Sequence, residues 1–103
     1  MKRQVLWSRG ALDDLKQIAD YIAEQNPVAG LRIGAMIRSA GDSLGEIPTG
    51  RRGRVTGTYE KVVHGIPYII AYRLEPLPED GEAVVILRAI HGARDWRTDA
   101  WPE

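Results

Sequence analysis

The chain has 103 residues, and its 14 basic and 14 acidic side chains give a formal net charge of zero at pH 7. This length is typical of one domain, and we expect residues 1–103 to form a single one. The absence of cysteine excludes disulfides, thiolate metal ligands and a cysteine nucleophile, and the balanced charge argues against strong non-specific binding to nucleic acid.

The amino terminus does not have the pattern of a secretion signal. The apolar run 5–7 is interrupted at once by Ser8 and Arg9, and no apolar run approaches the ~20 residues that a membrane-spanning helix needs. The sequence therefore predicts a cytoplasmic protein without a membrane partner. Residues 4–7 are short, apolar and followed by a capping residue, which predicts a strand before the first helix.

Two amphipathic helices are predicted next. Ser8 is the expected N-cap of the first helix, which has about four turns from Ala11 onward, and Asn26 with Pro27 ends it and begins the second. Helical spacing in the first predicts a buried face of Leu12, Leu15, Ile18, Ala19 and Ile22. The same spacing in the second predicts a buried face of Val28, Leu31, Ile33, Ile37, Ala40 and Leu44.

The second helix contains three glycines, Gly30, Gly34 and Gly41. Glycine inside a helix costs up to about 1 kcal/mol relative to alanine, so these positions call for a reason. One reason is a groove that receives a partner's helix. The other is close packing of the two helices on each other, which we favour because a short helix hairpin must pack on itself.

The second half of the chain predicts an antiparallel hairpin. The runs 68–74 and 83–90 are apolar at nearly every position, and residues 75–82 between them have the prolines, glycine and acids of a surface loop. Because the apolar residues do not alternate with polar ones, we expect both faces of these strands to be covered.

The segment before this hairpin predicts a loop, a strand and a turn. Residues 49–58 contain three glycines but no Gly-Lys-Ser/Thr, so they do not form a P-loop. Residues 59–63 have the pattern of a strand, and residues 64–67 have that of a turn. The order strand, helix, helix and three strands predicts an α+β domain whose antiparallel sheet carries the helix hairpin on one face.

Arginines are the main candidates for functional residues. Arg73 and Arg88 stand in the two apolar strands, where a charge is costly unless it is paired or reaches water. They therefore mark either a concave functional face or two structural ion pairs. Residues 49–74 contain five basic and one acidic side chain, a net charge of +4, whereas residues 75–103 contain three and seven, a net charge of −4. The candidate partner-binding set is Arg51, Arg52, Arg54, Arg73, Arg88 and Arg94.

A catalytic alternative uses some of the same residues. Arginines bind phosphate bidentately and a histidine can act as an acid or base near neutral pH, so a metal-free ribonuclease would use Arg73, Arg88 and His91. However, residues three apart in a regular strand face opposite sides, so a bulge would have to align Arg88 with His91. The other interpretation of His91 is a hydrogen-bonded residue at a strand end.

Other side chains give weaker signals. His64 and His91 without cysteine make at best a weak metal site, so we expect no metal and no cofactor. Trp7, Trp96 and Trp101 suit base stacking, but tryptophans beside apolar strands are more often packing residues.

The ordered set of motifs resembles the ParE branch of the RelE/ParE toxins, which belong to type II toxin–antitoxin systems. The segments that carry the resemblance are Trp7-Ser8, Asp14-Leu15, Tyr21-Ile22, Asn26-Pro27, Gly57-Thr58-Tyr59-Glu60, Pro67-Tyr68-Ile69-Ile70, Tyr72-Arg73 and Ile90-His91-Gly92-Ala93-Arg94-Asp95-Trp96. The resemblance implies a strand, a helix hairpin and an antiparallel sheet, as the pattern does. It also implies a cognate antitoxin whose C-terminal segment wraps the toxin in a hetero-oligomer.

The resemblance leaves two activities open, since ParE-like members poison DNA gyrase and RelE-like members cut messenger RNA in the ribosome. RelE-like members are strongly basic, whereas this chain has a pI of about 6.7. We therefore expect a bacterial toxin that inhibits gyrase, stabilises plasmids and arrests growth without being an enzyme. The alternatives are a ribosome-dependent endoribonuclease and an inactive module that only binds an antitoxin.

Overall fold

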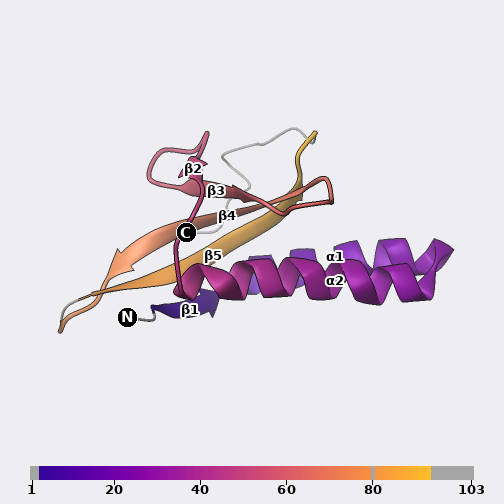
Figure 1. Ribbon diagram of the computed structural model, residues 1–103, viewed down its shortest axis with the longest axis horizontal. Coiled ribbons are helices and arrows are strands. Elements are labelled where there is room, and N and C mark those ends of the chain that lie inside the picture. Colours follow the sequence, from indigo (N-terminus) through magenta and orange to yellow (C-terminus); the bar gives the residue numbers. More distant parts are fainter. Residues whose placement is uncertain (1–2, 80, 94–103) are drawn as a thin grey trace.

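The computed structural model describes residues 3–79 and 81–93, which form two helices on one face of a five-stranded sheet (Figure 1). This arrangement confirms the predicted α+β class. The strands lie in the order β1-β5-β4-β3-β2. In chain order the elements are β1 (Gln4–Trp7), α1 (Arg9–Gln25), α2 (Pro27–Asp42), the 3₁₀ helix η1 (Ser43–Gly45), β2 (Arg51–Arg52), β3 (Tyr59–Val62), β4 (Tyr68–Pro76) and β5 (Glu82–His91).

The sheet is mixed. The predicted hairpin of β4 and β5 is present, and β2 to β5 pair antiparallel as expected. β1 instead joins the sheet parallel to β5, with Gln4 beside Ala83 and Trp7 beside Ile86. A parallel pair needs a long crossover connection, and the helix hairpin with the three following strands supplies it. The two-residue β2 lies in the segment that the sequence predicted as a loop.

The predicted helix boundaries are confirmed by their caps. The Ser8 hydroxyl accepts a hydrogen bond from the backbone N–H of Ala11 at 3.0 Å. The Asn26 side chain accepts one from the N–H of Ala29 at 3.1 Å, and Pro27 occupies the first position of α2. Each cap satisfies a backbone donor that a helix start leaves without an intrahelical partner.

Gly30 and Gly34 of α2 lie where the two helices meet, which supports close packing of the hairpin on itself, whereas Gly41 packs against Trp7 and Ile86 of the sheet. A Cβ on Gly30 would lie 2.7 Å from the backbone oxygen of Ala19 and 2.8 Å from the Cβ of Ala23. Because this glycine face turns toward α1, the predicted buried face of α2 is partly wrong. Val28 and Leu31 lie on the surface, and in α1 Leu12 is exposed while Ala11 is fully buried.

The core lies between the helices and the sheet. Ile37 of α2 and Leu44 of η1 are fully buried against Ile70, Tyr72 and other residues of β4 and β5. In β4 the four consecutive residues from Ile69 to Tyr72 are all buried, which confirms that both faces of the hairpin are covered. The Tyr72 hydroxyl, which lies deep in the core, donates a 2.9 Å hydrogen bond to the backbone oxygen of Thr49.

Within residues 3–79 and 81–93, neither helix has both the length and the apolar composition that crossing a membrane requires.

Candidate partner-binding surface

Arg88 is held in an ion pair that joins the sheet to α1. Its Nε and one terminal nitrogen donate to the two carboxylate oxygens of Asp14, at 2.6 and 3.0 Å. Asp14 also accepts a 3.0 Å hydrogen bond from the backbone N–H of Ala89. The hydrogen bonds to Asp14 raise the pKa of Arg88 above its ordinary value. Of the two roles predicted for Arg88, the structure supports the structural ion pair.

Asp14 and Ser8 together complete the edge of β5 where β1 ends. The Ser8 backbone N–H donates to the oxygen of Ile86, and its hydroxyl donates to the oxygen of Leu87 at 3.1 Å. The next N–H along this edge belongs to Ala89, and it donates a hydrogen bond to the Asp14 carboxylate. Unpaired strand edges attract other chains, so these side chains replace the missing strand neighbour.

Each residue of the catalytic alternative contacts a partner within its own chain. Arg73 forms a 2.8 Å ion pair with Glu75 on its own strand. The sheet has an irregularity between Ala71 and Tyr72 of β4, but it falls before Arg88 on β5 and does not align Arg88 with His91. Arg88 pairs opposite Ala71, and His91 pairs three residues further along, opposite Tyr68. The side chains of Arg88 and His91 therefore leave the strand on opposite faces of the sheet, although the Arg88 guanidinium reaches Asp14, which lines the same pocket as His91.

The Arg51–Arg54 segment folds over a buried carboxylate. The Glu60 side chain is only 2% exposed, and it accepts hydrogen bonds from the Arg54 backbone N–H at 2.8 Å and from the Arg54 guanidinium at 3.1 Å. Arg51 lies 3.6 Å from the same carboxylate. Arg52 is exposed beside them. Of the three predicted partner-binding arginines in this segment, Arg51 and Arg54 are thus also part of an internal ion-pair cluster.

This cluster sets the acidity of Glu60. Burial alone would raise the pKa of its carboxyl group, but the hydrogen bonds and positive charges of Arg54 and Arg51 outweigh burial and hold the pKa below its ordinary value.

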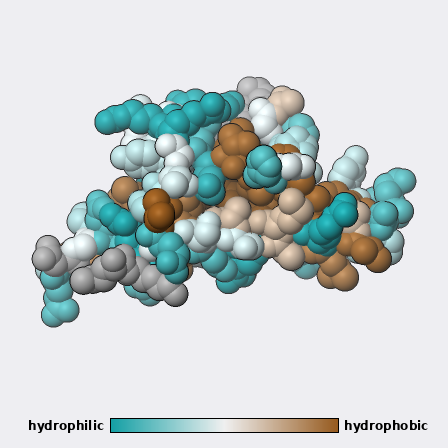
Figure 2. Space-filling view, in the orientation of Figure 1, coloured by the Kyte–Doolittle hydropathy of each residue, from teal (hydrophilic) through white to brown (hydrophobic). Residues whose placement is uncertain are grey.

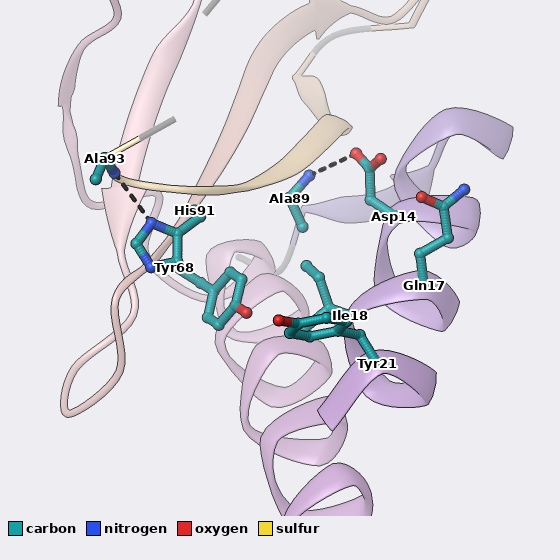
Figure 3. A pocket seen from close by; sticks show the side chains of 8 residues that line it. All are labelled: Asp14, Gln17, Ile18, Tyr21, Tyr68, Ala89, His91 and Ala93. Carbon is teal, nitrogen blue, oxygen red and sulfur yellow. Dashed lines mark hydrogen bonds between the residues drawn. The ribbon is translucent and has the colours of Figure 1, made fainter. Parts of the chain in front are cut away.

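A pocket of about 570 Å³ opens between α1 and the hairpin of β4 and β5 (Figure 3). The His91 and Tyr68 rings meet edge to face, with centroids 5.4 Å apart, and Figure 3 shows the Tyr68 and Tyr21 side chains turned toward each other. The backbone N–H of Ala93 donates to His91 Nδ1 at 3.1 Å, so the neutral ring carries its proton on Nε2. Asp14 and Gln17 form the α1 side of the pocket.

This pocket was only partly predictable from the sequence. His91 was a candidate, and the hairpin pairing that places Tyr68 opposite it follows from the two apolar runs. The contribution of Tyr21 and Gln17 could not be predicted, because it depends on the rotation of α1 over the sheet. The pocket places a carboxylate, an amide and an imidazole beside aromatic rings, which suits binding of a polar side chain or base.

The far end of the helix hairpin exposes apolar side chains. Tyr21, Val28 and Leu31 are 72%, 74% and 78% exposed, and Figure 2 shows an apolar surface at the end where the helices extend beyond the sheet. Clustered exposed apolar side chains are typical of surfaces that bind another protein.

The remaining predicted residues have simpler outcomes. Trp7 is a packing residue: its Nε1 donates to Asp42 at 2.9 Å, and the Arg38 guanidinium lies 5.1 Å from its ring centroid. Arg94, Trp96 and Trp101 lie outside the described residues. In the described ranges no three His, Asp or Glu side chains come together as a metal site would require.

Comparison with known proteins identifies the family. Residues 5–96 match the family described as the ParE toxin of type II toxin–antitoxin system, parDE. Toxin RelE2 of Caulobacter vibrioides is 41% identical over 88% of this chain and 97% of its own length. Y4kP of Sinorhizobium fredii is 38% identical over 92% and 94%.

The fold also matches a solved structure. A chain in the structure of the chromosomal ParDE toxin–antitoxin system from P. aeruginosa covers 87% of this chain and 96% of its own length with a TM-score of 0.75, at 23% identity. The fold, the sequence match over nearly the whole chain and the identity to curated toxins agree. The chain belongs to the ParE toxin family of type II toxin–antitoxin systems.

Proposed function

We propose that residues 1–103 form one toxin domain that acts in the cytoplasm by binding DNA gyrase, and that a cognate antitoxin neutralises it. The match to the ParE family supports this target. The ion pairs of the two arginines favour binding over RNA cleavage, because Arg73 and Arg88 are each paired with an acid of their own chain. In addition, the His91 side chain leaves β5 on the opposite face of the sheet from that of Arg88. A ribonuclease would need these groups around one phosphate.

The antitoxin is proposed to cover the exposed end of the helix hairpin. Tyr21, Val28 and Leu31 expose apolar surface there, and such side chains are the usual anchors of a protein–protein interface. The exposed Arg52 and the half-exposed Arg51 and Arg54 supply positive charge for acidic groups of a partner. The proposed complex is a toxin–antitoxin hetero-oligomer.

A supercoiling assay tests the proposed target. Purified gyrase is given relaxed plasmid and ATP, with increasing amounts of the protein, and then with the protein preincubated with its antitoxin. We expect supercoiling to be lost with the toxin alone and restored by the antitoxin. Unchanged supercoiling at a large excess of toxin that still arrests growth would exclude gyrase as the target.

Cleavage of messenger RNA is the second candidate. Two curated relatives from Caulobacter vibrioides carry the name RelE, and His91 lies beside Tyr68 at the edge of a pocket. A translating extract with intact gyrase separates the two functions. Messenger cleavage that disappears in His91→Gln would support the ribonuclease, whereas intact messenger with growth arrest in cells supports gyrase.

A further inference from the structure

The pocket between α1 and the hairpin of β4 and β5 has more hydrogen-bonding groups than the protein itself uses. In the described part of the chain, no hydrogen bond engages the Gln17 amide or the hydroxyls of Tyr21 and Tyr68, which all line the pocket. The backbone N–H of Ala93 occupies His91 Nδ1, so the Nε2 proton of the neutral ring is left to donate. These groups are therefore available to a polar ligand.

Asp14 keeps one acceptor position for such a ligand. Its Oδ2 accepts from the Arg88 Nε and the Ala89 N–H, whereas within the described residues Oδ1 accepts only from Arg88. A carboxylate oxygen has two acceptor sites, so Oδ1 can accept one more hydrogen bond. Gln17 follows three residues later on the same face of α1. The α1 wall thus combines an acceptor with an amide that both accepts and donates.

The charge in the pocket is balanced, which indicates a neutral ligand. Arg88 pairs with Asp14, the acid that lines the pocket, and the described lining residues include no lysine or arginine. A phosphate group would therefore find no cation there, and a cationic ligand would compete with Arg88 for the carboxylate. A purely apolar ligand would bury the polar groups without partners, which is costly.

Aromatic rings favour a flat ligand. The Tyr21 side chain is 72% exposed, so a face of its ring is open to stacking. The Tyr68 and His91 rings, which meet edge to face, border the opposite side of the pocket (Figure 3). The volume of about 570 Å³ is in the range of small-molecule sites and accommodates a bicyclic ring system.

We infer that this pocket binds the adenine base of a free nucleoside. Gln17 pairs with the N6 amino group and N7 of the base, as glutamine does in bidentate contacts with adenine. Asp14 Oδ1 accepts the second N6 hydrogen. From the opposite wall the His91 Nε2–H donates to N3, on the far side of the purine, and the base stacks on the Tyr21 ring.

The same contacts predict what the pocket rejects. Guanine and hypoxanthine carry a carbonyl oxygen in place of the N6 amino group, and this oxygen would face the Asp14 carboxylate. An adenine within a nucleic-acid strand is disfavoured, because no described lining residue supplies the positive charge that holds a phosphate backbone. The inference does not depend on which target the toxin inhibits.

Titration of nucleosides into the ¹⁵N-labelled full chain, followed by NMR, tests the inference. The chain is used without antitoxin, since Tyr21 also belongs to the surface proposed to bind that partner. The probes are adenosine, inosine, guanosine and a single-stranded oligoadenylate. We expect adenosine to shift the Gln17 side-chain amide and the Ala93 backbone amide most. Inosine and guanosine should bind at least about tenfold more weakly, a difference of about 1.4 kcal/mol.

Two pairs of variants make the test decisive. Gln17→Leu should weaken adenosine binding at least about tenfold, whereas Gln25→Leu, the same change at the exposed last residue of α1, should bind as wild type. Tyr21→Ala should weaken binding by a similar factor, whereas Tyr21→Phe keeps the stacking ring and should not. All three positions are exposed, and urea midpoints identify any variant that is unfolded.

Four outcomes would overturn the inference. They are an absence of adenosine binding, equal binding of adenosine and inosine, insensitivity to Gln17→Leu, and tighter binding of oligoadenylate than of adenosine. Because binding is measured on the toxin chain alone, none of them bears on the inhibition of gyrase.

Discussion

Asp14 is the residue on which the contact between α1 and the sheet depends most. It accepts two hydrogen bonds from Arg88 and one from the Ala89 backbone, and neither charged side chain is far exposed. Removing the carboxylate leaves a guanidinium partly buried without its counter-charge. Asp14→Asn should therefore lower the free energy of unfolding by about 2 kcal/mol, as measured by urea denaturation.

Two comparisons show whether this loss belongs to the ion pair. The double variant Asp14→Asn with Arg88→Met should lose less free energy of unfolding than the two single variants lose together. The reason is that Arg88→Met removes the positive charge that Asp14→Asn leaves without its partner. Lys16→Ala breaks an exposed pair with Asp20 and should leave the urea midpoint unchanged within error. Additive losses in the double variant would contradict the role given to Asp14.

Glu60 predicts a dependence of stability on acidity. The pKa of its carboxyl group is lower in the folded protein than the ordinary 4.5, so the unfolded chain binds the proton more readily. The stabilisation is complete above pH 4.5 and is lost as the pH falls through the folded pKa. The urea midpoint of the wild type should therefore fall more steeply below about pH 4.5 than that of Glu60→Gln. Parallel curves for the two proteins would mean that the Arg54 cluster does not act on this carboxylate.

At the scale of single residues, the sequence indicated which arginines matter but not what they contact. Arg73 and Arg88 were predicted either to face a ligand or to be paired, because a charge in an apolar strand requires one or the other. For Arg88 the choice depends on Asp14, which is 74 residues away in the sequence. The spacing of charges on α1 does not reveal that Asp14 reaches the edge of β5.

At the scale of elements, two glycines of α2 give opposite predictions. A Cβ at Gly30 would lie 2.7 Å from the Ala19 oxygen, whereas one at Gly34 would lie 3.4 Å from the Ala19 Cβ, an ordinary contact. Gly30→Ala should therefore destabilise the protein by about 1–3 kcal/mol by forcing the helices apart. Gly34→Ala should stabilise it by about 0.5–1 kcal/mol through reduced backbone entropy. Thermal or urea unfolding of both variants measures the difference, and equal effects would contradict the close packing at Gly30.

The elements themselves could largely be predicted from local patterns. Caps at Ser8 and Asn26, helical spacing and the two apolar runs are local signals, and each corresponds to an element of the structure. The rotation of α2 was not predicted, because its apolar residues cover more of the helix than the core can bury. The parallel pairing of β1 was not predicted either, since its partner β5 lies at the far end of the chain.

At the scale of the whole molecule, the exposed end of the helix hairpin separates partner binding from stability. Leu31 is 78% exposed, so Leu31→Glu should change the free energy of unfolding by less than about 0.5 kcal/mol. It should nevertheless weaken antitoxin binding at least about tenfold if the antitoxin covers this surface. Binding of the Leu31→Glu variant to the antitoxin can be measured by calorimetry. In cells that express this variant together with the antitoxin, growth arrest should persist. Glu24→Lys, on the exposed side of α1, is the control for a charge change near the same end.

The pairing of β1 with β5 ties the order of synthesis to the completion of the fold. Ser8, just after β1, bonds to Leu87, 79 positions later. A growing chain can form its helix hairpin early, but β1 and the Asp14 carboxylate have no strand to join until nearly all residues have been translated. Prematurely terminated products would thus lack the finished sheet, and a bacterium carrying the gene would be exposed to active protein only from full-length translation.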